Sequence, residues 1–225
     1  MGLSEYITSK LIQKKAFTYY EEDIFLIKKV LSLIPHQKPR VLDVGCGNGH
    51  FSFIFEKCGA KVTAFDYNTQ FIEENKKRAI SIGSSIQFLW ADGRHPEFYF
   101  NESEFDMIFM SGFSLFAVDI SPPLMEKYFQ LLTDNGKLIF IQNSNQRENI
   151  RRTHIRNYSI AQLKNKFNQL NCNIENVFFY AHHISGRLFL SYVFCDFSTA
   201  LDKIFSRITG FPCNIVLTVS RRNGH

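Results

Sequence analysis

No run of apolar residues in this sequence is long enough to cross a lipid bilayer. The longest one, from Leu188 to Cys195, is interrupted by Ser191 and falls far short of the roughly 20 residues that a membrane-spanning helix needs. A secretory signal is also lacking, because the stretch from Met1 to Lys15 contains charged residues but no apolar core. We therefore expect a cytoplasmic protein with no transmembrane segment.

A metal-binding or disulfide pattern of cysteines and a large net charge are lacking as well. The five cysteines are odd in number and none of them form a CxxC pair, which argues against a disulfide framework and a structural zinc site. We expect no metal. The net charge of +5 suits an anionic substrate but is too small to require nucleic acid as a partner. No repeat, low-complexity run or flexible linker interrupts the chain, so we expect one domain over residues 1–225.

What the sequence does contain is a regular alternation of strands and helices. Apolar residues at helical spacing predict a first helix from Phe17 to Ile34, which Pro35 ends. Strands are expected at Arg40 to Val44, Lys61 to Asp66, Ile86 to Trp90, Asp106 to Met110, Lys137 to Gln142, Asn173 to Phe179 and Cys213 to Val219. Helices are expected between them, at about 51–58, 70–80, 121–132, 159–170 and 197–208. This order predicts βαβ units around a mostly parallel sheet.

The most informative stretch is a strand that runs into a glycine-rich turn and then a helix. It reads Val41-Leu-Asp-Val-Gly-Cys-Gly-Asn-Gly49. Glycines in such a turn let a ligand lie against bare backbone, and ligands of doubly wound folds bind at this edge of the sheet. A dinucleotide site would have the pattern G-x-G-x-x-G, but His50 stands where its last glycine belongs. Asp43, at the end of the strand, would repel a pyrophosphate and attract an ammonium group.

Two further acids follow the next two strands. Asp66 ends the second strand, where a carboxylate can accept hydrogen bonds from both hydroxyls of a ribose. Asp92 follows the third strand, in a position to accept a hydrogen bond from the exocyclic amine of adenine, with Tyr67 and the Gly93 backbone beside the ring. S-adenosylmethionine (SAM) carries an ammonium, a sulfonium, a ribose and an adenine but no phosphate, so it fits this set of groups.

These elements together resemble a known family. Residues 38 to 142 are similar to the class I (Rossmann-like) SAM-dependent methyltransferases in the order and spacing of five segments. The segments are Asp43-Val-Gly-Cys-Gly-Asn-Gly, Asp66, Ala91-Asp92, Phe105-Asp106-Met-Ile-Phe and Leu132-x-x-x-Gly136-Lys-Leu-Ile. A weaker similarity continues through Tyr158-Ser159-x-x-x-Leu163.

The resemblance implies both a fold and a set of site residues. The fold is a Rossmann-like seven-stranded, mostly parallel α/β sheet with helices on both faces and an antiparallel last strand. The cofactor is SAM, with S-adenosyl-L-homocysteine (SAH) as product. The residues implied to hold the methionine part are Asp43, Gly45, Cys46 and Gly47, with Asp66 on the ribose, Asp92 on the adenine, and Met110 and Ser111 beside the transferred methyl. Within the single domain we distinguish an N-terminal helical segment (1–37), a cofactor-binding core (38–142) and a substrate-side half with a lid (143–225).

The acceptor is open at this stage. A hydroxyl of a sugar or another small metabolite is the favoured acceptor. For such a hydroxyl, His154 or His183 is a candidate general base, and each also has an ordinary surface or structural interpretation. Tyr20, Arg151 and Arg152 are candidate substrate contacts.

Three further questions stay open. The protein could instead be an RNA- or protein-modifying methyltransferase, or a SAM-binding module without catalysis. The apolar segment from Ser185 to Pro212 could be core, or a lid that contacts a lipid-linked substrate. The protein could be a monomer or a homodimer. Asp106, at the start of its strand, is interpreted as structural.

Overall fold

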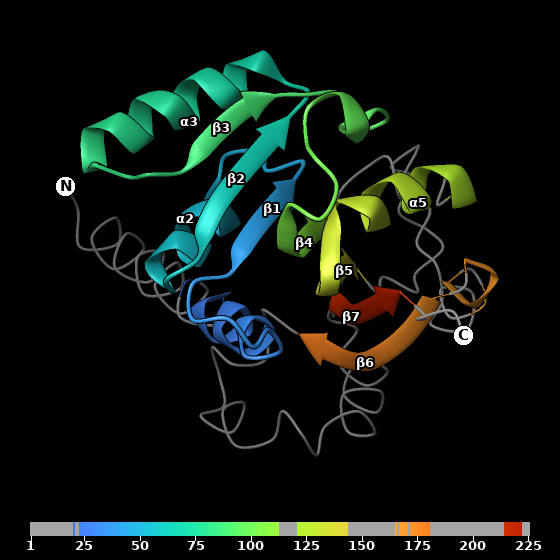
Figure 1. Ribbon diagram of the computed structural model, residues 1–225. Coiled ribbons are helices and arrows are strands. Elements are labelled where there is room, and N and C mark those ends of the chain that lie inside the picture. The colour runs from blue at the N-terminus through green and yellow to red at the C-terminus, as the bar shows by residue number, and fades with distance from the viewer. Residues whose placement is uncertain are drawn as a thin grey trace, which may run out of the picture.

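A seven-stranded sheet forms the centre of the fold (Figure 1). The computed structural model describes residues 20, 23–112, 121–143, 165, 167–170, 172–180 and 214–221. The strands are β1 (Arg40–Val44), β2 (Lys61–Asp66), β3 (Gln87–Trp90), β4 (Phe105–Ser111), β5 (Leu132–Asn143), β6 (Cys172–Tyr180) and β7 (Asn214–Arg221). The helices are α2 (His50–Lys57), α3 (Thr69–Ile82), α5 (Pro122–Leu131) and the 3-10 turn η1 (Pro96–Phe98).

The strand order is β3-β2-β1-β4-β5-β7-β6. Strands β1 to β5 pair in parallel, whereas β7 is antiparallel to both β5 and β6. This confirms the predicted Rossmann-like sheet with an antiparallel last strand. The order reverses between β1 and β4, and ligands of open α/β sheets bind outside the carboxyl ends of the strands at such a switch point.

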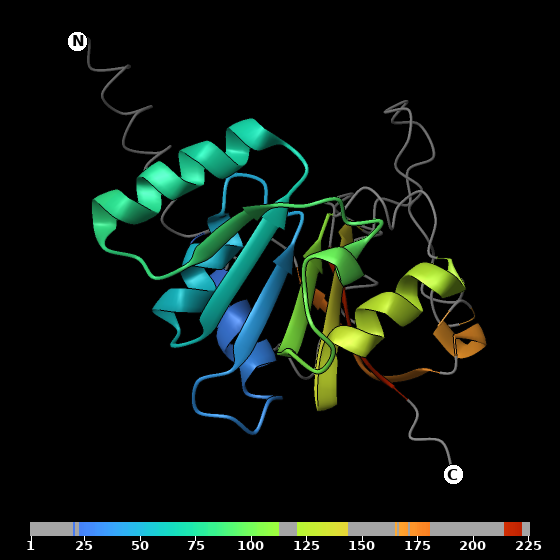
Figure 2. The same ribbon diagram turned by 45° about the horizontal axis from the view of Figure 1, so that its top comes forward.

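Each face of the sheet has its own apolar layer, because successive residues of a strand point to opposite faces. On one face, Val41 of β1 belongs to a cluster with α2, α3 and the helix at 23–31. On the other face, Leu42 and Val44 belong to a cluster with α5. Figure 2 shows α2 and α5 on opposite sides of the sheet. The alternation puts Asp43 on the α2 face, buried in the layer that this helix covers.

The helix ends follow their local sequence. At the start of α3, the side chain of Asn68 accepts a hydrogen bond from Gln70 N, and Gly83 ends the helix with a φ of 68°. Pro122 opens α5 as predicted, and Ser121 occupies the N-cap position without a side-chain capping bond. The helix expected from 17 to 34 is described at residue 20 and over 23–31.

β5 begins five residues earlier than expected. The sequence predicts a turn at Asn135-Gly136 and a strand only from Lys137. In the structure, Phe105 of β4 pairs with Leu132 and Met107 pairs with Lys137, with an irregularity between them. The predicted turn is therefore a register irregularity within β5 rather than a boundary of the strand.

The remaining sequence expectations concern membrane spans, cysteines and the apolar segment before β7. No helix of the described residues is long and apolar enough to cross a membrane. Cys46, Cys58 and Cys172 are free thiols. The helix expected at 197–208 and the segment from Ser185 to Pro212 lie outside the described residues.

Candidate functional site

The glycine loop turns the chain from β1 into α2 in left-handed backbone conformations. The φ angles are 68° at Gly45, 52° at Gly47 and 74° at Gly49. Residues that have a side chain rarely adopt positive φ angles, so this loop conformation favours glycine. Met110 and Ser111 end the neighbouring strand, where Met110 pairs with Val44 directly before the loop. Met110 is fully buried and Ser111 is half-buried.

Asp43 is a buried carboxylate next to this loop. Its Oδ2 accepts a hydrogen bond of 2.5 Å from Ser52 Oγ, in the first turn of α2. Burial raises the pKa of Asp43 to about 6, the Ser52 hydrogen bond opposes that rise, and the charge of Asp66 adds to it. Within the part of the chain that the structure describes, no lysine or arginine pairs with Asp43. Among the described residues, the site therefore presents a buried carboxylate with no lysine or arginine to balance its charge.

Asp66 is held by two backbone N–H groups. Gly47 N donates to its Oδ2 at 2.9 Å, and Asn68 N donates to its Oδ1 at 2.8 Å. Since each carboxylate oxygen has two acceptor positions, both oxygens keep one for a ligand. Asp66 thus joins the glycine loop to the end of β2 while retaining the capacity to bind hydroxyls.

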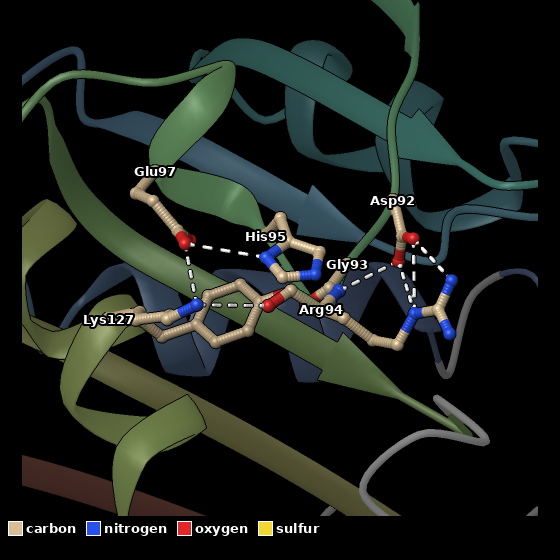
Figure 3. A network of polar contacts seen from close by, with 7 residues as sticks. Asp92, Gly93, Arg94, His95, Glu97 and Lys127 are labelled. Atoms are coloured by element: carbon tan, nitrogen blue, oxygen red, sulfur yellow. Dashed lines mark hydrogen bonds and ion pairs between the residues drawn. The ribbon is translucent and has the colours of Figure 1, made fainter.

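Asp92 has a partner that the sequence analysis does not predict. Arg94 reaches both carboxylate oxygens of Asp92, with Nε at 3.0 Å from each and Nη2 at 2.6 Å from Oδ2 (Figure 3). These hydrogen bonds lower the pKa of Asp92 to about 2. Asp92 is therefore ionised throughout the physiological range. A bidentate guanidinium also restricts the directions from which an adenine amine can reach it.

A polar network ties the loop after Asp92 to α5. Tyr128 is fully buried and its hydroxyl donates to Gly93 O at 2.8 Å. Lys127 Nζ donates to Glu97 Oε1 at 2.5 Å and to Arg94 O at 3.4 Å (Figure 3). The buried tyrosine thus holds the carbonyl of Gly93, and the lysine holds the next carbonyl, that of Arg94.

Two exposed aromatic rings stand at the carboxyl ends of β2 and β3. Tyr67 has 65% of its surface exposed and Trp90 has 44%. Their ring centroids are 5.7 Å apart, and Trp90 Nε1 donates to Tyr67 O at 2.8 Å. Tyr67 was predicted beside the adenine, but Trp90 was not, although the chain contains only one tryptophan.

Tyr20 and His50 lie where the N-terminal helix meets α2. His50 Nε2 is 2.6 Å from Oδ2 of the buried Asp23. Tyr20 packs its ring edge toward His50, with 6.3 Å between centroids, and Lys57 Nζ donates to its hydroxyl at 3.4 Å. Tyr20 was predicted as a substrate contact; in the structure its described partners belong to α2.

Two other residues are held in states that do not suit an acid, a base or a nucleophile. Asp106 accepts hydrogen bonds from Arg40 N, Nε and Nη2 at 2.9 to 3.2 Å, as its structural interpretation predicts. Burial raises the pKa of the Cys46 thiol, so it stays protonated and is a poor nucleophile. In the described part of the chain, no group of histidine, cysteine and acidic residues could hold a metal ion.

The remaining candidates lie outside the described residues. They are the proposed bases His154 and His183 and the proposed substrate contacts Arg151 and Arg152. One residue that the sequence analysis missed lies within the site: Asn75 Nδ2 donates to Gly47 O at 2.8 Å. A signal for it was present, because Asn75 shares the buried face of α3 with Ile72 and Ala79.

Comparisons with known proteins agree with this fold. Residues 41–136 match the model of a family described as a methyltransferase domain. The fold is similar to that of a SAM-dependent methyltransferase from Thiobacillus denitrificans in complex with S-adenosyl-L-homocysteine, with a TM-score of 0.60 and 16% identity over 89% of this chain and 91% of that chain. No protein of curated function is similar enough in sequence to count as a match.

Two further solved structures have a similar fold and show that it does not determine the reaction. A SAM-dependent methyltransferase from Methanosarcina mazei has a TM-score of 0.61 and 14% identity, over 86% of this chain and 98% of that chain. The [4+2]-cyclase SpnF has a TM-score of 0.63 and 16% identity, over 89% of this chain and 81% of that chain. At such identities the likeness shows the fold alone, and one fold hosts more than one chemistry.

Proposed function

Since the chain belongs to the class I, SAM-dependent methyltransferases, we propose that it methylates a hydroxyl of a small molecule, a sugar or another hydroxylated metabolite. The cofactor is SAM and the product is SAH. When bound, SAM supplies an electrophilic methyl group on a sulfonium centre. The protein's own part is then to bind the cofactor, to orient the acceptor and to remove its proton.

The observation that carries the cofactor assignment is the charge of Asp43, which has no lysine or arginine partner among the described residues. It is buried on the α2 face, and a second carboxylate, Asp66, is near enough to raise its pKa. Burying a carboxylate without a cation is costly. The ammonium and sulfonium groups of SAM would supply the missing positive charge, whereas a pyrophosphate would be repelled.

Each part of the cofactor has residues that suit it. Asp43 and the loop residues Gly45, Cys46 and Gly47 would hold the methionine part. Asp66 would hold the ribose through the acceptor positions that its two backbone contacts leave over.

The adenine and methyl ends complete the assignment. Asp92, Tyr67 and the Gly93 backbone would surround the adenine. Met110 and Ser111, at the end of β4, would border the methyl group. This division makes 38–142 the cofactor-binding core, preceded by a helical segment (1–37).

The acceptor half is assigned to 143–225. A hydroxyl must lose its proton as it is methylated, and His154 or His183 would accept that proton. Arg151, Arg152 and Tyr20 would contact the acceptor. The proposal of a small acceptor rests on the modest net charge of +5 and on the absence of a basic stripe in the sequence.

An acceptor screen tests this function. Purified protein is incubated with SAM and a panel of sugars, sugar nucleotides and other hydroxylated metabolites, and SAH formation and a methylated product are measured by mass spectrometry. We expect turnover with a hydroxylated small molecule, reduced about 100-fold or more in His154→Ala or His183→Ala with SAH affinity unchanged. Methylation of RNA or protein, with no small molecule accepted, would contradict the proposal.

A further inference from the structure

We propose that Asn75 is a positioning residue for the cofactor, which it serves by holding the glycine loop from the neighbouring helix α3. Its Nδ2 donates to Gly47 O at 2.8 Å, and the side chain is 3% exposed. The inference rests on the cofactor role assigned above to the same loop.

The location of Asn75 singles it out. Its neighbours on the buried face of α3 are Ile72 and Ala79, and an apolar residue of similar size would fill this position. Burying an amide there costs free energy unless the amide is hydrogen-bonded. The amide finds its partner in the glycine loop rather than in its own helix, which points to a requirement of the loop.

Asn75 contacts the loop at a second glycine. A Cβ built on Gly49 would lie 2.8 Å from Asn75 Oδ1 and 3.1 Å from its Cγ. The side chain therefore packs against the bare backbone of Gly49, which is the N-cap residue of α2. One amide thus holds the middle of the loop by a hydrogen bond and its end by close packing.

The contacts form a closed chain between α3 and Asp66. Gly47 O binds Asn75, and Gly47 N binds Asp66 Oδ2. Asp66 Oδ1 accepts from Asn68 N, and Asn68 is the N-cap of α3, the helix that carries Asn75. Both polar groups of Gly47 are therefore occupied. Loss of the Asn75 amide would leave Gly47 O without this hydrogen bond. Gly47 could then adopt other backbone conformations, because glycine has wide conformational freedom.

The expected consequence is weaker cofactor binding. A loop that must be ordered when the ligand binds loses affinity relative to one that is already ordered. Loss of one hydrogen bond together with this ordering corresponds to about a tenfold increase in the Kd for SAH. Asp66, which depends on the same glycine, would lose its fixed orientation with the loop.

Calorimetric titration of the full-length protein with SAH tests the inference in three variants. Asn75→Leu removes the amide at similar volume. Ile72→Ala, the matched control, disturbs the same buried face of α3 without touching the loop. Asn75→Asp keeps the shape, but its carboxyl can donate to Gly47 O only when protonated. The pKa of Asp43, close to the same loop, is about 6, so Asp43 also changes charge over this pH range. The Kd of Asn75→Asp is therefore divided by that of the wild type at each pH.

We expect Asn75→Leu to raise the Kd for SAH about tenfold. Ile72→Ala should change this Kd less than threefold, although it lowers the melting temperature. The ratio of the Asn75→Asp Kd to the wild-type Kd should fall from tenfold or more at pH 8 to threefold or less at pH 5. Wild-type Kd in Asn75→Leu would overturn the inference. So would an Asn75→Asp ratio below about threefold at pH 8, where the carboxylate cannot donate to Gly47 O, and that result also decides the case if Asn75→Leu fails to fold. Failure of the wild type to bind SAH would refute the cofactor role of the loop itself, and the inference with it.

Discussion

His50 Nε2 lies 2.6 Å from Asp23 Oδ2 and so joins the N-terminal helix to the first residue after the glycine loop. Asp23 is buried, and the histidine side chain is 42% exposed. The contact spans 27 positions of sequence. The packing of the helix at 23–31 therefore depends on His50, which directly follows the glycine loop.

The His50 contact predicts a stability effect. His50→Ala should lower the free energy of unfolding by about 1 kcal/mol, a value kept small because the imidazole is partly exposed to solvent. His36→Ala is the matched control, since His36 lies 3.8 Å from Asp106 and its removal should cost less than about 0.5 kcal/mol. Urea denaturation of both variants measures the difference, and equal losses would contradict the role given to the His50 contact.

The raised pKa of Asp43 predicts how stability changes with pH. A carboxyl whose folded pKa of about 6 exceeds its usual 3.8 binds a proton more tightly in the native state. Its contribution therefore stabilises the fold below about pH 4 and is lost as the pH rises through 6. Relative to Asp43→Asn, the wild type should lose on the order of 2 to 3 kcal/mol between pH 4 and pH 7. Parallel pH curves for the two proteins would show that Asp43 does not titrate in this window.

The same carboxyl predicts the opposite trend for cofactor binding. Only ionised Asp43 attracts the ammonium group of SAH, so affinity should increase as the pH rises from 5 to 7. Ser52→Ala removes the hydrogen bond that opposes the pKa rise and should move the midpoint of this increase to higher pH. Calorimetry across the pH range measures both, and a shift to lower pH in Ser52→Ala would be inconsistent with the assignment.

Gly49 predicts a steric effect that can be separated from backbone strain. Gly49 and Gly83 have similar φ angles of 74° and 68°, but only Gly49 has a side chain in the way of an added Cβ. Gly83→Ala should cost about 1 kcal/mol for the left-handed backbone. Gly49→Ala should cost clearly more and should also raise the Kd for SAH about tenfold or more, because Asn75 must shift away from the loop. Thermal denaturation and SAH titration of both variants check this, and equal behaviour would rule out the close packing of Asn75.

Much of the fold follows from local sequence. The bounds of β1 and β2 were predicted correctly because buried parallel strands are short apolar runs, here bounded by charged residues and glycine. Asp43 and Asp66 could be proposed as site residues for the same reason, since each stands near or at the end of a recognisable strand. Sequence reasoning finds residues whose position follows from the residues next to them in the chain.

Residues whose partners come from elsewhere in the fold were missed. The sequence does not specify that Asn75 reaches Gly47, 28 positions away, or that Tyr128 reaches Gly93 across 35 positions. The start of β5 was wrong for a related reason, because Asn135-Gly136 favours a turn locally while pairing with β4 continues on both sides of it. In each case tertiary packing decides what local preference cannot.

The central claim is that this carboxyl edge binds SAM through its acidic residues, and one titration tests it most directly. Wild-type protein and Asp66→Ala are titrated with SAH by calorimetry, with circular dichroism to verify that the variant is folded. The account predicts micromolar binding by the wild type and a loss of at least about 100-fold in the folded variant, since two ribose hydrogen bonds to a carboxylate are removed. Equal affinity of the two proteins, or no binding by the wild type, would contradict it.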